Sequence, residues 1–192
     1  MTALATAEPE PATPPSPSNR GRRRTLIVTA VIVVAVAAAA AALRPTPSRR
    51  AALLGRDAPG FELPNLIEGQ PPVVVPVGQP TVVNFWASWC LPCRKEMPAL
   101  QAVHRQLGDR VRFVGVDHTD SRADALALAR STGVGYPSGF DPEGNVAGRY
   151  GLGGLPSTVL ISADGRVEAV HLGPFTADGL RAALGRAFHL AT

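Results

Sequence analysis

The chain of 192 residues contains two cysteines, Cys90 and Cys93, which are separated by two residues. A pair at this spacing can cycle between dithiol and disulfide, bind a metal, or form a purely structural bond. A zinc site needs about four ligands, and the histidines are scattered without a paired metal spacing. A structural disulfide that closes so short a loop gains little entropy. We therefore favour redox chemistry over metal binding and over a structural bond.

The segments around the cysteines favour different roles for the two thiols. Cys90 follows a β-rich run and comes just before a segment whose apolar residues have helical spacing. The free amide groups and the dipole of a helix N-terminus stabilise a thiolate. We expect Cys90 to attack a substrate disulfide and Cys93, one turn inside the helix, to resolve the mixed disulfide. Pro92 stands at an early helical position, where its missing N–H costs little.

The hydrophobic pattern after residue 55 predicts alternating strands and helices. The predicted strands are 71–77, at a sheet edge because of its prolines, then 81–86 and 111–116, and a hairpin of 157–161 and 166–172. The predicted helices are 93–107, about 121–131, a short one at 145–150, and 177–188. Residues 133–144 are broken by Gly and Pro and contain a turn at 141–144. This order indicates an α/β domain with a mixed sheet and helices on both faces.

The N-terminal quarter has a different composition. Residues 1–24 are rich in Ala, Pro, Ser and Thr, which predicts a disordered cytoplasmic tail. Residues 25–43 contain no charge, Gly or Pro, and nineteen such residues can cross a bilayer as one helix. Because eight of these nineteen residues are Ala, which is only weakly apolar, a cleaved signal peptide is the alternative. Residues 44–54 are predicted to be a spacer, and residues 55–192 the folded domain.

The positive charge of the chain lies beside this apolar stretch. Residues 1–50 carry seven Arg and two Glu, a net +5, whereas residues 51–192 carry twelve Lys plus Arg and thirteen acidic residues, a net −1. A near-neutral domain argues against binding to nucleic acid. The arginines are denser before the apolar stretch than after it, so the positive-inside rule predicts a single-pass protein of the cell membrane with a cytoplasmic N-terminus and an extracytoplasmic domain.

The segment VVNFWASWCLPCRKEMPAL, residues 82–100, resembles the active-site segment of the extracytoplasmic thioredoxin-like proteins grouped as the TlpA/ResA/CcmG family. A second similarity is YGLGGLPST, residues 150–158. The resemblance covers residues 55–190. It implies a thioredoxin fold, in which a central mixed sheet is flanked by helices, with additional N-terminal strands within 61–77 and a central insertion before residue 156.

The resemblance also implies functional positions. Pro156 is expected to follow a cis peptide bond, to face the cysteine pair and to act in catalysis, and Leu155 beside it to help align an incoming chain. Trp89, Leu155 and Pro92 are assigned to the substrate-binding surface. Glu96, three residues after the second cysteine, is the candidate for adjusting the proton balance of the pair, and its alternative is a solvated helix residue. Asn84 stands where cytoplasmic thioredoxins have a buried Asp, and an amide cannot transfer protons.

We therefore expect an extracytoplasmic thiol-disulfide oxidoreductase, anchored in the membrane and monomeric, with no cofactor except the Cys90–Cys93 disulfide. Its substrates would be disulfides of exported proteins, such as apocytochrome c, and its electrons would come from a membrane donor of the CcdA/DsbD type. One alternative is a peroxiredoxin-like peroxide reductase, although the Thr-x-x-Cys pattern is missing. Another is a copper-handling protein of the Sco type, although the two cysteines of that family are separated by three residues, whereas Cys90 and Cys93 are separated by two.

Overall fold

The computed structural model describes residues 31–36, 53–75 and 77–190. The chain divides into two compact units, Met1–Thr46 and Pro47–Thr192. In the first unit residues 31–36 are helical and fall inside the predicted membrane segment. The remainder of that segment, the predicted tail and residues 44–52 of the predicted spacer lie outside the described residues. No helix in the described ranges combines the length and the apolar character needed to span a bilayer.

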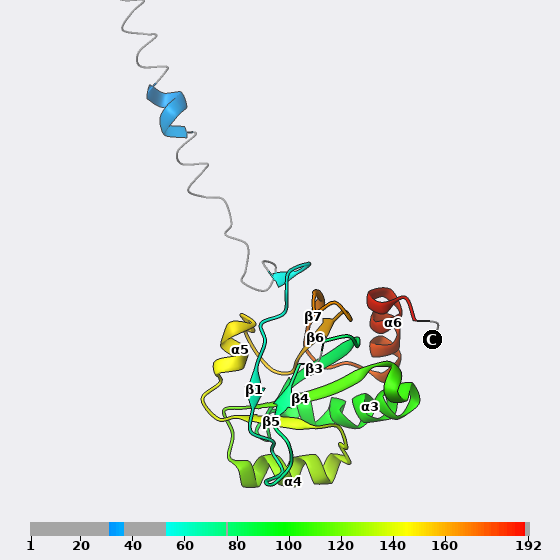
Figure 1. Cartoon of the computed structure of the whole chain (residues 1–192). Coiled ribbons are helices and arrows are strands. Elements are labelled where there is room, and N and C mark those ends of the chain that lie inside the picture. The colour runs from blue at the N-terminus through cyan, green and yellow to red at the C-terminus, as the bar shows by residue number, and fades with distance from the viewer. Residues whose placement is uncertain (1–30, 37–52, 76, 191–192) are drawn as a thin grey trace, which may run out of the picture. The chain divides into compact units, whose positions relative to one another are not determined.

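The second unit is built on a five-stranded mixed sheet in the order β5-β4-β3-β6-β7 (Figure 1). The neighbouring pairs β3–β4 and β4–β5 are parallel, whereas β6 runs antiparallel to both β3 and β7. The strands are β3 (Thr81–Trp86), β4 (Arg112–His118), β5 (Ser138–Asp141), β6 (Ser157–Ile161) and β7 (Val167–Leu172). Two short strands that precede them, β1 (Glu62–Leu63) and β2 (Val73–Val74), form a separate antiparallel pair.

Helices cover both faces of this sheet. The helices are α3 (Leu91–Leu107), continued by a 3₁₀ turn at Gly108–Arg110, then α4 (Arg122–Thr132), α5 (Asn145–Arg149) and α6 (Ala177–Phe188). One face packs its apolar side chains against α3, α4 and α6. The opposite face packs against α5 and the β1–β2 pair. The predicted α/β thioredoxin-like architecture, with a mixed sheet, helices on both faces and extra N-terminal strands, is confirmed.

Strand β3 is the centre of the domain and carries the segment that leads to the cysteines. All six of its residues are buried, because strands lie on both sides of it and helices cover both faces. Val83 and Phe85 point into the α5 side, whereas Val82 and Trp86 point toward α3. The chain leaves the sheet after Trp86, and α3 begins five residues later.

The helix boundaries follow the capping residues visible in the sequence. The side chains of Ser121 and Thr176 accept hydrogen bonds from backbone N–H groups in the first turns of α4 and α6, at 3.1 Å in each case. Gly133 ends α4 with φ of +70°, a conformation that favours glycine. Helix α3 starts at Leu91, two residues before the predicted start.

The stretch 133–144 differs from its prediction, because it contains β5. This strand gains its place from pairing with β4 on one side and with the chain before α3 on the other, where Leu66 N–H donates to Ser138 O (2.7 Å) and Phe140 N–H to Pro64 O (2.8 Å). Tertiary pairing therefore overrides a local sequence that contains Gly and Pro. With α4, β5 accounts for the predicted insertion between β4 and residue 156.

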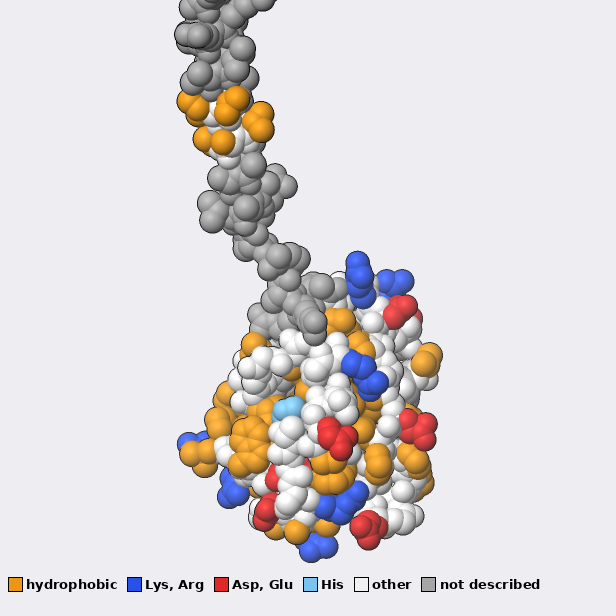
Figure 2. Space-filling model, turned by 90° about the vertical axis from the view of Figure 1, so that its left-hand side faces the viewer, with side chains coloured by type: hydrophobic (Ala, Val, Ile, Leu, Met, Phe, Trp, Pro, Cys, Tyr) orange, Lys and Arg blue, Asp and Glu red, His pale blue; other side chains and the backbone are white. Residues whose placement is uncertain are grey.

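Charged side chains of both signs are interspersed over the face of the domain that Figure 2 presents, and neither sign forms a broad area on that face. This distribution agrees with the near-neutral charge of residues 51–192.

Candidate active site

Cys90 and Cys93 form a disulfide at the N-terminus of α3, with their Cα atoms 5.3 Å apart. Cys90 is the N-cap residue, and its Sγ accepts a hydrogen bond from the Cys93 backbone N–H at 3.2 Å. Cys90 is 4% exposed and Cys93 is fully buried. The sulfur of Cys90 thus lies among the free amides of a helix N-terminus, where a thiolate is stabilised.

Trp89 and Pro92 flank this sulfur on the outside of the molecule. Trp89 is 60% exposed, and its indole N–H donates to Thr119 O at 3.1 Å, which attaches the ring to the loop after β4. Pro92 is exposed in the first turn of α3. Both residues are therefore accessible to a partner chain, and their role in substrate binding stays a prediction.

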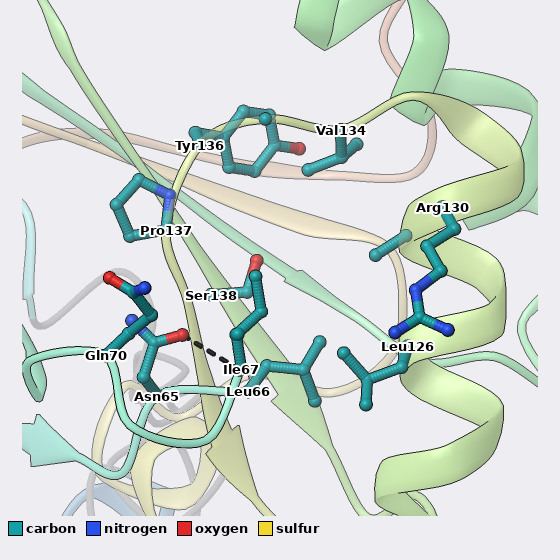
Figure 3. Close-up of a pocket in the computed structure, with 12 residues that line it drawn as sticks. Asn65, Leu66, Ile67, Gln70, Leu126, Arg130, Val134, Tyr136, Pro137 and Ser138 are labelled. Atoms are coloured by element: carbon teal, nitrogen blue, oxygen red, sulfur yellow. Dashed lines mark hydrogen bonds between the residues drawn. The ribbon is translucent and has the colours of Figure 1, made fainter.

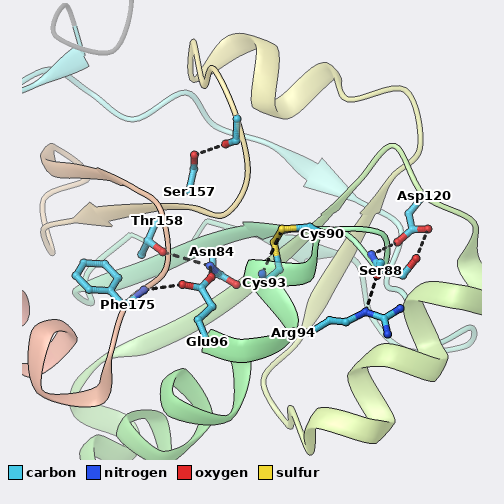
Figure 4. The surroundings of a disulfide bond; sticks show 11 residues. Asn84, Ser88, Cys90, Cys93, Arg94, Glu96, Asp120, Ser157, Thr158 and Phe175 are labelled. Carbon is cyan, nitrogen blue, oxygen red and sulfur yellow. Dashed lines mark hydrogen bonds between the residues drawn. A yellow bond between two sulfur atoms is a disulfide. The ribbon is translucent and has the colours of Figure 1, made fainter.

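Glu96 lies inside the protein, one turn beyond Cys93, and is 1% exposed. Its Oε1 accepts from Asn84 Nδ2 and its Oε2 from the Phe175 backbone N–H, both at 2.9 Å (Figure 4). Burial raises the pKa of Glu96 from 4.5 to about 7, and the hydrogen bonds from Phe175 and Asn84 oppose this rise only in part. The alternative of a solvated helix residue is therefore wrong. A carboxyl with this pKa can exchange a proton near neutral pH.

Asn84 is the link between Glu96 and the strand on the other side of β3. Its Nδ2 also donates to Thr158 Oγ1 at 3.2 Å, while its Oδ1 is buried and has no partner in the described residues. The amide thus supplies a hydrogen-bond donor to the Glu96 carboxyl.

Leu155 and Pro156 precede β6 and are joined by a cis peptide bond, as predicted. Pro156 is buried, and its carbonyl accepts from Gly173 N–H at 2.9 Å. Leu155 is partly buried and packs against the apolar cluster that contains both cysteines. The structure therefore brings Leu155 to the cluster that contains the cysteines, although it lies 62 residues beyond Cys93 in the sequence.

The loop before Cys90 is held from the opposite side by Asp120. The carboxylate of Asp120 accepts from the Ser88 backbone N–H and from Ser88 Oγ (2.8 Å), and Arg94 Nε donates to Ser88 O at 2.8 Å. In Figure 4 this group lies on one side of the disulfide, and the group of Glu96 and Asn84 lies on the other.

A model of the AhpC/TSA family matches residues 54–170, more than half of the 192 residues. The chain belongs to the AhpC/TSA family. The thiol:disulfide interchange protein DsbE of Allochromatium vinosum is 34% identical over 128 residues, which cover 65% of this chain and 70% of that protein. The thiol-disulfide oxidoreductase ResA of Bacillus anthracis is 30% identical over 129 residues, which cover 66% of this chain and 74% of ResA.

Solved structures agree with this membership of the AhpC/TSA family. StoA from Bacillus subtilis superposes with a TM-score of 0.57 at 28% identity, covering 65% of this chain and 96% of StoA. A DsbF homologue from Corynebacterium diphtheriae superposes with a TM-score of 0.61 at 28% identity, covering 68% of this chain and 86% of that protein. The predicted similarity to ResA and CcmG-type proteins is confirmed, and so is the prediction of a thiol-disulfide oxidoreductase with a Cys-x-x-Cys pair.

Three hollows in the described part of the chain lie outside the cysteine pair. One, of about 320 Å³, lies between the Asn65–Gln70 loop and α4, and none of the predicted site residues lines it (Figure 3). A second, of about 550 Å³, lies along the segment between β1 and β2, beside Arg122. The third, of about 490 Å³, is a groove between α3 and α4 that Trp89 and Ser88 border. The groove, unlike the first hollow, is continuous with the surface beside the disulfide.

Sequence reasoning missed Asp120 and the backbone of Phe175. Asp120 follows β4, which is parallel to β3, so its position at the carboxyl end of a neighbouring strand was the available signal. Parallel strands bring their carboxyl ends to one edge of a sheet, and Cys90 follows the carboxyl end of β3. The Phe175 N–H has no such signal, because it lies 79 residues from Glu96 and belongs to the main chain.

Proposed function

We propose that this chain is a membrane-anchored, extracytoplasmic reductase of disulfides in exported proteins. The observation that carries the proposal is the combination of a Cys-x-x-Cys pair at a helix N-terminus with a buried carboxyl one turn further along the same helix. Residues 25–43 would form the anchor, with residues 1–24 in the cytoplasm, residues 44–54 as the spacer and residues 55–192 outside.

The reaction begins with the reduced pair. The Cys90 thiolate attacks one sulfur of a substrate disulfide, forms a mixed disulfide and releases the other substrate sulfur as a thiolate that takes up a proton. Cys93 then loses its proton and attacks Cys90 Sγ. The substrate leaves as a dithiol, and the enzyme is left with the Cys90–Cys93 disulfide that the structure contains.

Glu96 is proposed to receive and return the proton of Cys93. The two residues are one helical turn apart and both are buried, so bulk water has little access to the thiol. A carboxyl whose pKa is about 7 is ionised often enough to accept a proton and protonated often enough to return it. Asn84, as an amide, orients Glu96 but transfers no proton.

We infer the electron donor and the substrates from the extracytoplasmic location proposed above. An exported reductant needs electrons from the membrane, and we propose a donor of the CcdA/DsbD type. The substrates would be oxidised exported proteins such as apocytochrome c, bound as an extended segment against Leu155 and Pro156 with Trp89 and Pro92 at the rim. We propose that the enzyme acts as a monomer and binds neither metal nor nucleic acid.

Trapping the mixed disulfide tests the direction of attack. In the full chain, Cys93→Ala should accumulate a Cys90-linked adduct with a disulfide-containing substrate, detected by mass spectrometry, and Cys90→Ala should not. A trapped adduct on Cys93 in the Cys90→Ala chain, with none in Cys93→Ala, would reverse the roles.

The reduction potential tests the direction of electron flow. A value near that of thioredoxin, about −270 mV, supports a reductant, whereas a value near about −120 mV would mark an oxidant and overturn the proposal. Rapid oxidation of Cys90 by peroxide, or retention of Cu(I), would instead favour the peroxiredoxin-like or the Sco-like alternative. Alkylation of Cys90 in intact cells by a membrane-impermeant reagent tests the extracytoplasmic location.

A further inference from the structure

The groove between α3 and α4 is lined on its α4 side by one face of that helix. The residues of this face are three and four apart in the sequence: Asp124, Ala127, Leu128 and Ser131. Only Leu128 is buried, and it packs in the apolar cluster that also contains both cysteines. Ala127 and Ser131 have short, exposed side chains, so they leave the groove of about 490 Å³ open beside that cluster.

The groove is continuous with the site of attack through the two residues before Cys90. Ser88 and Trp89 both line it, and Trp89 is 60% exposed. A substrate whose cysteine reaches Cys90 therefore has residues on one side of that cysteine beside this groove. Its occupant is in consequence a part of the substrate protein itself, held as an extended segment next to the cysteine that is attacked.

Arg94 supplies a positive charge on the α3 side of the groove. It is exposed, directly follows Cys93, and its Nε donates to Ser88 O at 2.8 Å (Figure 4). This bond fixes the base of the guanidinium, while its two terminal nitrogens form no hydrogen bond or ion pair with any residue that the structure describes. A guanidinium in this state can bind a carboxylate through two parallel N–H···O bonds.

Asp124 places a negative charge on the α4 side. Its carboxylate accepts from Ser121 Oγ at 2.6 Å, which holds it in the first turn of α4, and within the described ranges no ion pair joins it to Arg94. The groove thus has one cation on one wall and one anion on the other. Asp124 would repel a run of acidic residues, whereas a single carboxylate beside Arg94 is favoured.

We propose that this groove binds the segment next to the reactive cysteine of a substrate protein, and that Arg94 selects substrates with a single acidic side chain in that segment. The inference rests on the proposed function, because it names a feature of the substrates that the Cys90–Cys93 pair reduces. Arg94 is then a specificity-determining residue. It affects which chain is bound, while the electrons and the proton are still transferred by the cysteines and Glu96.

The selection is tested by exchange rates of the reduced full chain with synthetic peptides. Each peptide has one cysteine in a mixed disulfide with mercaptoethanol, and in successive peptides one Asn on either side of the cysteine is replaced by Asp. The best-placed Asp should raise the rate about fivefold over the all-Asn peptide, the upper range for an exposed ion pair, and added salt should reduce this ratio. Arg94→Gln should abolish the ratio. The matched control Lys95→Gln, which removes an exposed cation of α3 that does not line the groove, should preserve it.

The ratio of rates, not the rate, is the informative quantity, because Arg94→Gln also removes the bond to Ser88 O. A second variant, Ala127→Trp, fills the groove from the α4 side while Arg94 stays in place, and it should abolish the Asp preference as well. The proposal is overturned if no position of Asp is favoured, if the preference survives in Arg94→Gln or in Ala127→Trp, or if Lys95→Gln removes it to the same extent.

Binding without exchange separates this proposal from the proposed function. Peptides in which Ser replaces the cysteine are titrated into the oxidised full chain, and the fluorescence of Trp89, which lines the groove, reports their binding. Tighter binding of the Asp peptide to the wild type than to Arg94→Gln supports the groove, whereas equal binding, or none, overturns it. A wild-type chain that exchanges with no peptide disulfide refutes the proposed function, and the titration still decides whether the groove selects an acidic segment.

Discussion

Replacing Glu96 by Gln should change how the stability of the oxidised protein depends on pH. The variant is nearly isosteric, and its side chain can stay in place, because Asn84 Oδ1 is buried without a partner. If the Asn84 amide turns over, Oδ1 accepts from the new Gln N–H₂, and the Gln oxygen accepts from Phe175 N–H. The substitution therefore removes a titrating group while most of its hydrogen bonding remains.

The magnitude follows from the pKa of Glu96 in the folded and unfolded chain. Folding raises this pKa from 4.5 to about 7, so between these values the folded state binds more protons than the unfolded state. The free energy of unfolding then falls as the pH rises through this window and is level on both sides of it. The full decrease due to Glu96 is about 3 kcal/mol, and Glu96→Gln should abolish it.

The assay is urea unfolding of wild-type and Glu96→Gln chains, both with the disulfide formed, at a series of pH values from about 4 to about 9. Asp117 contributes a slope of the same sign, since its pKa is also raised, so the informative quantity is the difference between the two chains. We expect Glu96→Gln to gain stability relative to the wild type as the pH rises from about 4.5 to about 7.

One result would refute this reasoning. If the difference in unfolding free energy between the two chains is the same at every pH, the Glu96 carboxyl titrates alike in the folded and unfolded states. Burial would then not dominate its ionisation, and its proposed exchange of a proton with Cys93 would lose its basis.

Three further substitutions have distinct expected outcomes. Gly115→Ala should lower the unfolding free energy by about 2 kcal/mol in urea titrations, because the added Cβ would lie 2.8 Å from the Trp86 indole nitrogen. The control Gly148→Ala, where the added Cβ has open space around it, should leave the unfolding free energy unchanged. Asn84→Asp should destabilise the chain more near pH 8 than near pH 5, because a second carboxylate would face Glu96. Equal shifts of the urea unfolding midpoint at the two pH values would contradict this expectation. Trp89→Ala should slow disulfide exchange with a protein substrate about tenfold in a stopped-flow assay, but should not slow exchange with a small disulfide. It should change the unfolding free energy by no more than about 0.5 kcal/mol, since the ring is mostly exposed.

The central part of the site could be predicted because its geometry is local. Cys90 and Cys93 are three residues apart, and the strand before them and the helix after them are specified by apolar runs and periodicity within a short stretch of sequence. The same holds for α6, whose cap Thr176 and apolar face are contiguous in the chain. Glu96 could be named only through the family resemblance, which implies a Glu three residues after the second cysteine, and the extent of its burial could not be predicted.

The features that escaped prediction depend on contacts between distant segments. Strand β5 has a weak local pattern and exists because β4 and the Pro64–Leu66 segment pair with it. Asp120 acts on Ser88 across 32 residues of sequence. The raised pKa values of Glu96 and Asp117 likewise follow from burial, a property of the assembled core rather than of the neighbouring residues.

The second donor to Glu96 has a consequence for mutagenesis. It is the main-chain N–H of Phe175, so replacing the Phe175 side chain leaves the hydrogen bond in the protein. An alanine scan of the site would therefore attribute the behaviour of Glu96 to Asn84 alone. Only an amide-to-ester replacement at residue 175 deletes this donor by itself. One of the hydrogen bonds that affect the acidity of Glu96 thus comes from the main chain, where a change of side chain between relatives neither reveals nor removes it.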